Sequence, residues 1–195
     1  AGLQRVMVQL PTEAISAVKD VNAAQIELTK VSNASGTQLS QYWDEASQSA
    51  TKYGSTISDV ISSTADWSRL GYKLDGAKKL SDATSLLQKV GDNMTQESAS
   101  SGLISTLKGF QMNADEVTKV VDVVNEVANT EPIDTAGIFD GLTRSASSMK
   151  AANNTFEETV ALITAANSVV QDPDSVGTAF KTKFYRNCLY VQKCA

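Results

Sequence analysis

Apolar residues recur every three to four positions along most of the chain, the spacing that places them on one face of an α-helix. Five valines show this most clearly, since they lie at i, i+3, i+4, i+7 and i+10: Val117, Val120, Val121, Val124 and Val127. Valine is β-branched and also suits strands. The charged residues between these valines follow the same helical period, so we predict a helix.

Capping signals divide this pattern into seven or more helices. Thr155 with Glu158 and Asn113 with Glu116 have the spacing of capping boxes, in which each side chain binds the other residue's backbone N–H. Further helix starts are predicted at Ser55 or Thr56, Asp75, Thr95, Asp134 or Thr135, and Asp172, and ends at Gly54, Gly71 and Gly91. The short loops between helices favour antiparallel neighbours in a compact multi-helix bundle, and the fold class is all-α.

The first third of the chain has a weaker pattern. Residues 1–10 fit a strand or a helix, with a preference for helix, and two polar helices follow, from Pro11 to a turn at 33–36 and from Gln38 to Tyr53. We therefore interpret residues 1–63 as an N-terminal helical, coiled-coil-like arm and residues 64–182 as the core helical domain. The apolar stripe expected along the first helix consists of Ile15, Val18, Ala23, Ile26 and Val31.

The composition favours closely packed aliphatic helices. Only 6% of the residues are aromatic, so the core is built mainly from Leu, Ile, Val and Ala. Gly102 and Gly109 lie inside a predicted helix, where each costs about 1 kcal/mol relative to alanine. They are tolerable if another helix packs closely against them.

Charge and residue usage exclude several function classes. The formal net charge is −5, and residues 113–140 hold seven acids against one base, which we interpret as a solvated helix face. No basic stripe is present, so we expect no nucleic-acid recognition. The chain has no histidine, the commonest acid–base catalyst, and Cys188 and Cys194 alone make neither a disulfide framework nor a zinc site. No apolar run reaches the ~18 residues that cross a bilayer.

Local clusters that could carry chemistry have simpler structural explanations. Glu157 and Glu158 are adjacent and point to different sides of a helix, so they do not form a catalytic pair. The group of Asp172, Asp174 and Ser175 lacks the other ligands of a calcium loop and is explained by helix capping. The aromatic residues Trp43, Trp67 and Phe110 are interpreted as core residues. We expect no enzyme activity, no catalytic, cofactor-binding or metal-binding residue, no cofactor and no small-molecule substrate.

Eight short segments carry a resemblance to a known family. In their order and spacing they resemble the core region of phage tail tape measure proteins, also called minor tail proteins, over about 120 residues. The segments are Trp67–Tyr72, Leu86–Gly91, Leu103–Phe110, Asn113–Glu116, Val124–Asn129, Leu142–Ser147, Leu162–Asn167 and Gln171–Thr178.

The resemblance implies a structural function. It implies an assembly module of a phage or prophage tail tape measure protein, which acts in tail assembly and length determination through helix-mediated contacts. The implied partners are further copies of the chain, tail chaperones and the tube protein, and the implied location is the virion, assembled in the bacterial cytoplasm. As one continuous helix, 195 residues span only about 290 Å. We therefore expect a module of a tape measure protein and not the complete element that sets the tail length.

Two alternatives stay open at the level of sequence. The first is a membrane-acting or host-facing helical module used in DNA ejection, with membrane contact at that stage. The second is a truncated prophage remnant with a host-interaction role. This second alternative is motivated by residues 183–195, which hold both cysteines and no acidic residue and depart from the family pattern. We interpret these residues either as a divergent last helix or as a frameshifted or truncated tail.

Overall fold

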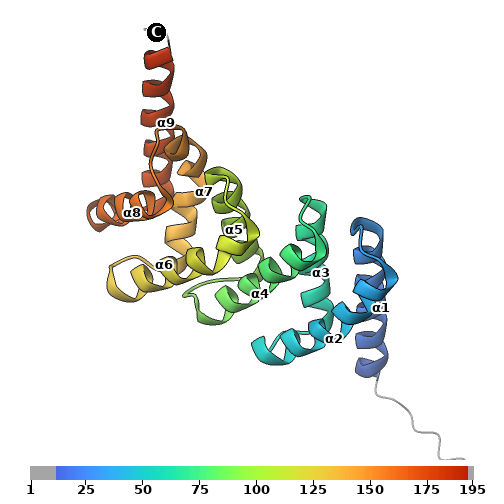
Figure 1. Cartoon of the computed structure of the whole chain (residues 1–195). Helices are drawn as coiled ribbons and strands as arrows, with labels where there is room; N and C mark the ends of the chain where they lie inside the picture. The colour runs from blue at the N-terminus through green and yellow to red at the C-terminus, as the bar shows by residue number, and fades with distance from the viewer. Residues whose placement is uncertain (1–11, 193–195) are drawn as a thin grey trace, which may run out of the picture. The chain divides into compact units, whose positions relative to one another are not determined.

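The structure, a computed structural model, describes the backbone of residues 12–192 and the side chains of residues 14–184. Within this range the chain forms nine α-helices, one short 3-10 turn and no strand (Figure 1), which confirms the all-α prediction. Residues 1–10, whose conformation the sequence left undecided, lie outside the described residues. The elements are α1 (Thr12–Val31), α2 (Gly36–Tyr53), α3 (Ile57–Arg69), α4 (Leu74–Val90), α5 (Gln96–Phe110), η1 (Ala114–Glu116), α6 (Val117–Thr130), α7 (Thr135–Ala151), α8 (Phe156–Val170) and α9 (Pro173–Gln192).

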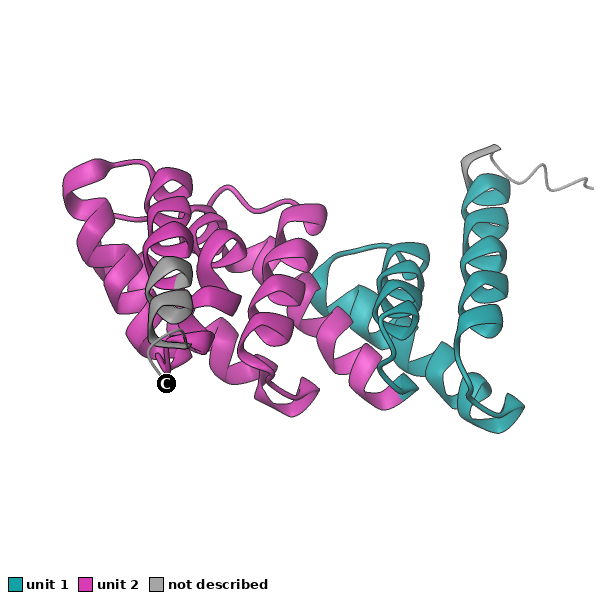
Figure 2. Cartoon of the chain, turned by 90° about the horizontal axis from the view of Figure 1, so that it is seen from above, with its two compact units in different colours: residues 1–74 teal, residues 75–195 magenta. Residues whose placement is uncertain are grey.

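The helices fall into two compact units (Figure 2). Unit 1 comprises residues 1–74 and unit 2 comprises residues 75–195. The domain limits expected at residues 63 and 182, and the coiled-coil character expected for residues 1–63, stay predictions.

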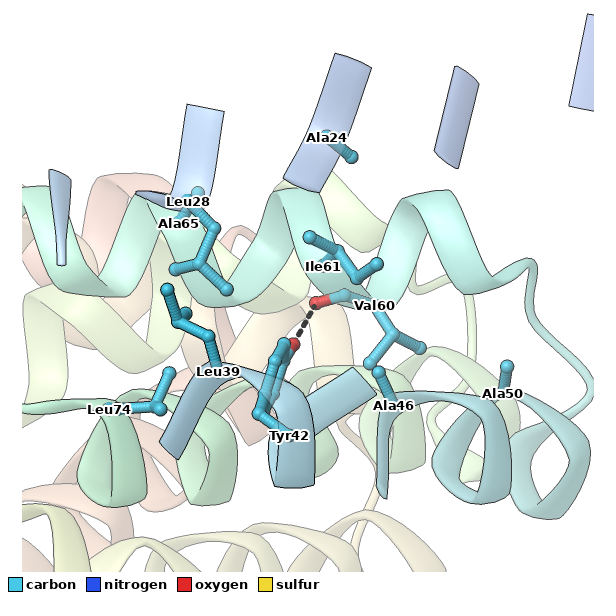
Figure 3. Close-up of a cluster of buried hydrophobic side chains, with 10 residues drawn as sticks. All are labelled: Ala24, Leu28, Leu39, Tyr42, Ala46, Ala50, Val60, Ile61, Ala65 and Leu74. Atoms are coloured by element: carbon cyan, nitrogen blue, oxygen red, sulfur yellow. Dashed lines mark hydrogen bonds between the residues drawn. The ribbon is translucent and has the colours of Figure 1, made fainter. Parts of the chain in front are cut away.

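Unit 1 has a hydrophobic core of its own. In it, α3 packs against both α1 and α2, and Leu28, Tyr42 and Ile61 are buried between the three helices (Figure 3). The Tyr42 hydroxyl lies 2.7 Å from Thr64 Oγ1, to which it donates, and Thr64 donates in turn to the Val60 carbonyl at 2.9 Å. The first two helices thus share a core with the third.

The apolar stripe predicted for α1 is wrong in its direction. Of the predicted residues, Ile15, Val18, Ala23 and Ile26 are exposed, Val18 at 70%, and Val31 alone packs against the core. Ala24 and Leu28 on the opposite face are buried. Two apolar faces of similar strength run along this helix, so hydrophobicity alone does not select one. The face with Ala24 and Leu28 lies in the core shared with α3.

In unit 2, α7 is the central helix. It packs against α5, α6, α8 and α9, and its residues Ile138, Leu142 and Met149 are fully buried. The valine-rich segment is helical, as predicted, and Val117, Val120, Val121 and Val124 of α6 are buried while Val127 is half-buried. A strand is thereby excluded for this segment.

Glycines set the separation of the helices in unit 2. A Cβ atom at Gly102 of α5 would lie 2.6 Å from the Phe139 ring of α7, and one at Gly109 would lie 2.5 Å from Ala146 Cβ. Both values are far below van der Waals contact, so α7 occupies the space that a side chain would need. The condition under which these two glycines are tolerable, a closely packed neighbouring helix, is therefore met.

The predicted caps set the helix boundaries. Thr95 and Thr155 each accept a hydrogen bond from the backbone N–H three residues later, at 3.1 Å, and Glu158 accepts from Thr155 N–H at 2.8 Å. Asp134 accepts from Gly137 N–H at 2.7 Å at the start of α7. Gly54 ends α2 in the left-handed conformation, with φ 66°, as the sequence predicted.

The last helix continues beyond the expected end of the core domain. The α9 backbone is helical from Pro173 to Gln192, so residues 183–192 extend it without a break. The frameshift or truncation proposed for residues 183–195 stays a prediction, and the side chain of Cys188 and all of Cys194 lie outside the described part. Among the described helices, none combines the length and hydropathy that crossing a membrane requires.

Candidate interaction surfaces

The adjacent carboxylates of α8 are held apart by different partners. Glu157 forms an ion pair with Lys119 of α6, and the hydrogen bond between them lowers the pKa of Glu157 and raises that of Lys119. Glu158 instead caps its own helix at Thr155. The two groups therefore do not converge on a common partner.

The two aspartates at the start of α9, Asp172 and Asp174, also have different partners. Asp172 accepts hydrogen bonds from the Ser175 backbone N–H at 3.1 Å and from its hydroxyl at 2.6 Å, and the hydroxyl hydrogen bond lowers the pKa of Asp172. Asp174 accepts from Arg144 Nε at 2.6 Å, which ties α9 to α7. In the described part of the chain, no group of three or more His, Cys, Asp or Glu side chains is placed to hold a metal ion.

The three aromatic residues interpreted as core residues differ in how deeply they are buried. Trp67 is 1% exposed and lies edge-on to Tyr72 with the ring centres 5.7 Å apart. Phe110 is buried against Phe156, at 5.9 Å. Trp43 is partly buried at the margin of the unit 1 core. Their interpretation as core residues is confirmed for Trp67 and Phe110, whereas Trp43 only packs against the edge of the unit 1 core.

Most of the acidic side chains of segment 113–140 lie on the outer surface of unit 2. Asp122 and Glu126 are exposed on α6, on the side opposite the buried valines. Asp115 pairs with Lys79 of α4, and Glu116 accepts a hydrogen bond from the Asn113 backbone N–H at 2.8 Å. The segment is thus a solvated helix face with caps and ion pairs, as the sequence indicated.

Asp140 has an unfavourable electrostatic environment. Partial burial raises the pKa of its carboxyl first, and the negative charges of Asp174 and Asp134 raise it further, against a smaller opposing effect of Arg144. Because the folded-state pKa lies above the unfolded value of 3.8, the charged form destabilises the fold. The destabilisation caused by the charged Asp140 carboxylate is fully present above the folded-state pKa. It disappears as the pH falls below the pKa of the unfolded state.

Replacing Asp140 with asparagine is therefore expected to stabilise unit 2 at pH 7, by less than about 1 kcal/mol because solvent screens the group. Urea unfolding followed by circular dichroism at pH 7 and at pH 3.5 measures the effect, and the gain should vanish at the lower pH. Asp122→Asn removes the same charge from the outer face of α6 and serves as the control, with no expected change. A loss of stability in Asp140→Asn at pH 7 would contradict the repulsion.

An exposed apolar face on α8 is the surface feature that the sequence interpretation missed. Leu162, Val169 and Val170 are exposed, Val169 at 84%, and Ala161 and Ala165 are exposed beside them. The opposite face of α8, with Phe156, Val160 and Ile163, is buried. Figure 1 shows α8 at the edge of unit 2 beside α9. A helix that is apolar on both faces is normally covered on both.

The signal for this face was present in the sequence. Thirteen consecutive residues, from Thr159 to Gln171, contain no charged side chain. Leu162 and Val169 are also out of phase with the buried Val160 and Ile163, so they do not belong to the same stripe. On α1 the exposed Ile15, Val18 and Ile26 form a second, sparser apolar face, interspersed with the exposed Lys19 and Asn22.

Comparison with known proteins identifies one family. A family model described as Phage-related minor tail protein matches residues 44–187, about three quarters of the chain. The match begins within α2, includes α3 to α8 completely and ends within α9. No solved structure matches the chain.

Proposed function

The chain belongs to the family of phage-related minor tail proteins, and from this premise we propose that it is a structural and assembly module of a tail tape measure protein. Family membership gives the coarser statement, a structural component of the phage tail and hence of the virion. It confirms the resemblance to minor tail proteins. The finer assignment, to the tape measure protein, is supported by the ordered set of core-region motifs between Trp67 and Thr178.

The packing of unit 2 supports a role through contacts. A ruler needs an extended helix that adds ~1.5 Å per residue. In unit 2, by contrast, α7 is covered by four other helices. We infer that unit 2 acts in length determination by binding other tail components and not by its own span.

The proposed partners are proteins with apolar helix faces. Such partners include further copies of this chain, tail chaperones and the tube protein. Unit 2 offers them the uncharged outer face of α8, with Leu162 and Val169. This face is continuous along one helix, which is the geometry of helix-mediated recognition.

An in-frame deletion of residues 75–182 from the phage gene tests this role. We expect the phage to form no completed tails, because the deletion removes the helices that hold the proposed contacts. If the same residues were part of an extended ruler, completed tails would instead be shorter by about 160 Å, from ~1.5 Å for each of the deleted residues. Electron microscopy of lysates, with tail lengths measured, distinguishes the two results.

Gly36→Ala in the same gene is the matched control. A Cβ atom at Gly36 meets nothing within 4 Å, so this variant should give tails of normal number and length. Tails of normal length from the deletion phage would overturn the proposed function.

A further inference from the structure

We propose that the outer face of α8 binds the same face of a second copy of this chain, with the two α8 helices antiparallel. The α8 face is defined as Leu162, Ala165, Ala166 and Val169. This inference rests on the proposed function, because it names one of the partners that a tail assembly module requires. Three observations carry it.

The first observation is exposure. Leu162, Ala165 and Val169 lie at i, i+3 and i+7, so they share one side of α8, and all three are exposed. Val169 is the most exposed of the large apolar side chains in the described part of the chain. Burying such side chains contributes about 25 cal/mol for each Å² of apolar surface removed from water.

The second observation is the absence of charge. In a contact with two-fold symmetry each group meets the same surface of its partner, so a charged face meets like charges. The acidic outer face of α6, with Asp122 and Glu126, would repel its own copy. The α8 face avoids this, because residues 159–171 carry no charge.

The third observation is the order of side-chain sizes along α8. Leu162 and Val169 are large and stand at equal distances from the small Ala165 and Ala166 between them. In an antiparallel pair centred between the two alanines, Leu162 of one copy lies opposite Val169 of the other, and the alanines meet at the crossing point. Small residues at the crossing point let two helices approach closely, while the larger ones pack on either side.

Glu158 selects the antiparallel arrangement over the parallel one. This exposed carboxylate lies on the same side as Leu162, one turn toward the start of α8. In a parallel pair the two Glu158 side chains would lie next to each other. In the antiparallel pair they stand about 22 Å apart, at ~1.5 Å per residue.

Sedimentation velocity on the full 195-residue chain tests the inference. We expect a dimer that forms with rising concentration, and we expect Val169→Glu to raise its Kd at least about thirtyfold, since the charge is buried twice in a symmetric contact. Val18→Glu places the same charge on an exposed valine of α1 and should leave the dimer unchanged. At concentrations too low for the dimer to form, circular dichroism should show equal melting temperatures for both variants and the unmodified chain, because association itself raises the melting temperature.

Cysteine cross-linking gives the geometry. In a background with Cys188→Ser and Cys194→Ser, Ala165→Cys should form a disulfide-linked dimer under mild oxidation, because the alanines meet at the crossing point. Glu126→Cys, exposed on α6, should stay monomeric and is the matched control.

Four results would overturn the inference. These are a monomer at every concentration, a dimer that Val169→Glu does not weaken, a dimer that Val18→Glu weakens equally, and no cross-link through Ala165→Cys. If the chain is a monomer that co-sediments with phosphatidylglycerol vesicles, and the Val169→Glu variant does not co-sediment with them, the α8 face binds lipid instead of a second copy. These experiments do not depend on the result obtained with the deletion phage. The proposed α8 contact can therefore be disproved while the role in tail assembly is supported, and the role in tail assembly can be disproved while the α8 contact is supported.

Discussion

Gly177→Ala is expected to destabilise unit 2 by about 2–3 kcal/mol, although alanine is the better helix former. Gly177 lies where α9 crosses α7. A Cβ atom there would stand 2.6 Å from the Gly141 carbonyl oxygen and 2.9 Å from Gly141 Cα. Both are backbone atoms of the central helix α7, and they cannot rotate away as a side chain does. The two helices α7 and α9 must therefore separate and lose contacts along their interface.

Urea unfolding followed by circular dichroism at 222 nm measures this effect. Gly36→Ala is the matched control, since a methyl group there meets nothing within 4 Å. It should leave the stability unchanged or raise it by up to about 1 kcal/mol through helix propensity. Equal unfolding midpoints for Gly177→Ala and the unmodified chain would show that α7 and α9 do not approach as closely as described.

Leu28→Ala is expected to destabilise unit 1 by about 2–4 kcal/mol, because it leaves a cavity in a small core. Leu28 is fully buried and belongs to the cluster that joins α1, α2 and α3. A unit with so few large core residues has little capacity to compensate for the loss. The variant therefore tests whether the first helices depend on a shared core or stand as an independent arm.

Tryptophan fluorescence during urea unfolding reports this change, since the two tryptophans of the chain, Trp43 and Trp67, both lie in unit 1. Val18→Ala on the same helix is the control. Val18 is exposed, so its truncation should change the free energy of unfolding by less than about 0.5 kcal/mol. Similar effects of the two substitutions would contradict the assignment of the buried face of α1.

Local signals in the sequence were reliable where one physical effect dominates. The capping pair Thr155 and Glu158 marks the start of α8, because hydrogen bonds between residues three apart depend only on the local backbone. The valines of α6 identify a helix and its buried face, because the opposite side carries Asp122 and Glu126. There the contrast between the two faces leaves one solution.

Prediction failed where both faces of a helix are apolar. On α1 the stripe through Ile15, Val18 and Ile26 was taken as the core face, whereas Ala24 and Leu28 are buried. On α8 the outward side of Leu162 and Val169 was not recognised as a surface at all. Periodicity reports that a face is apolar but does not report which neighbouring helix covers it.

The sequence by itself determined the all-α class, most helix boundaries and caps, and, through its ordered motifs, the resemblance to the minor tail family. These depend on contacts between residues a few positions apart or on the order of short motifs. The tertiary structure decided which face of each helix is buried, that α7 is central, and that the outer face of α8 is left exposed. Those features depend on contacts between residues far apart in the chain, such as Gly177 with Gly141. Such a contact forms only when the close approach of two whole helices is favourable, which no local pattern specifies.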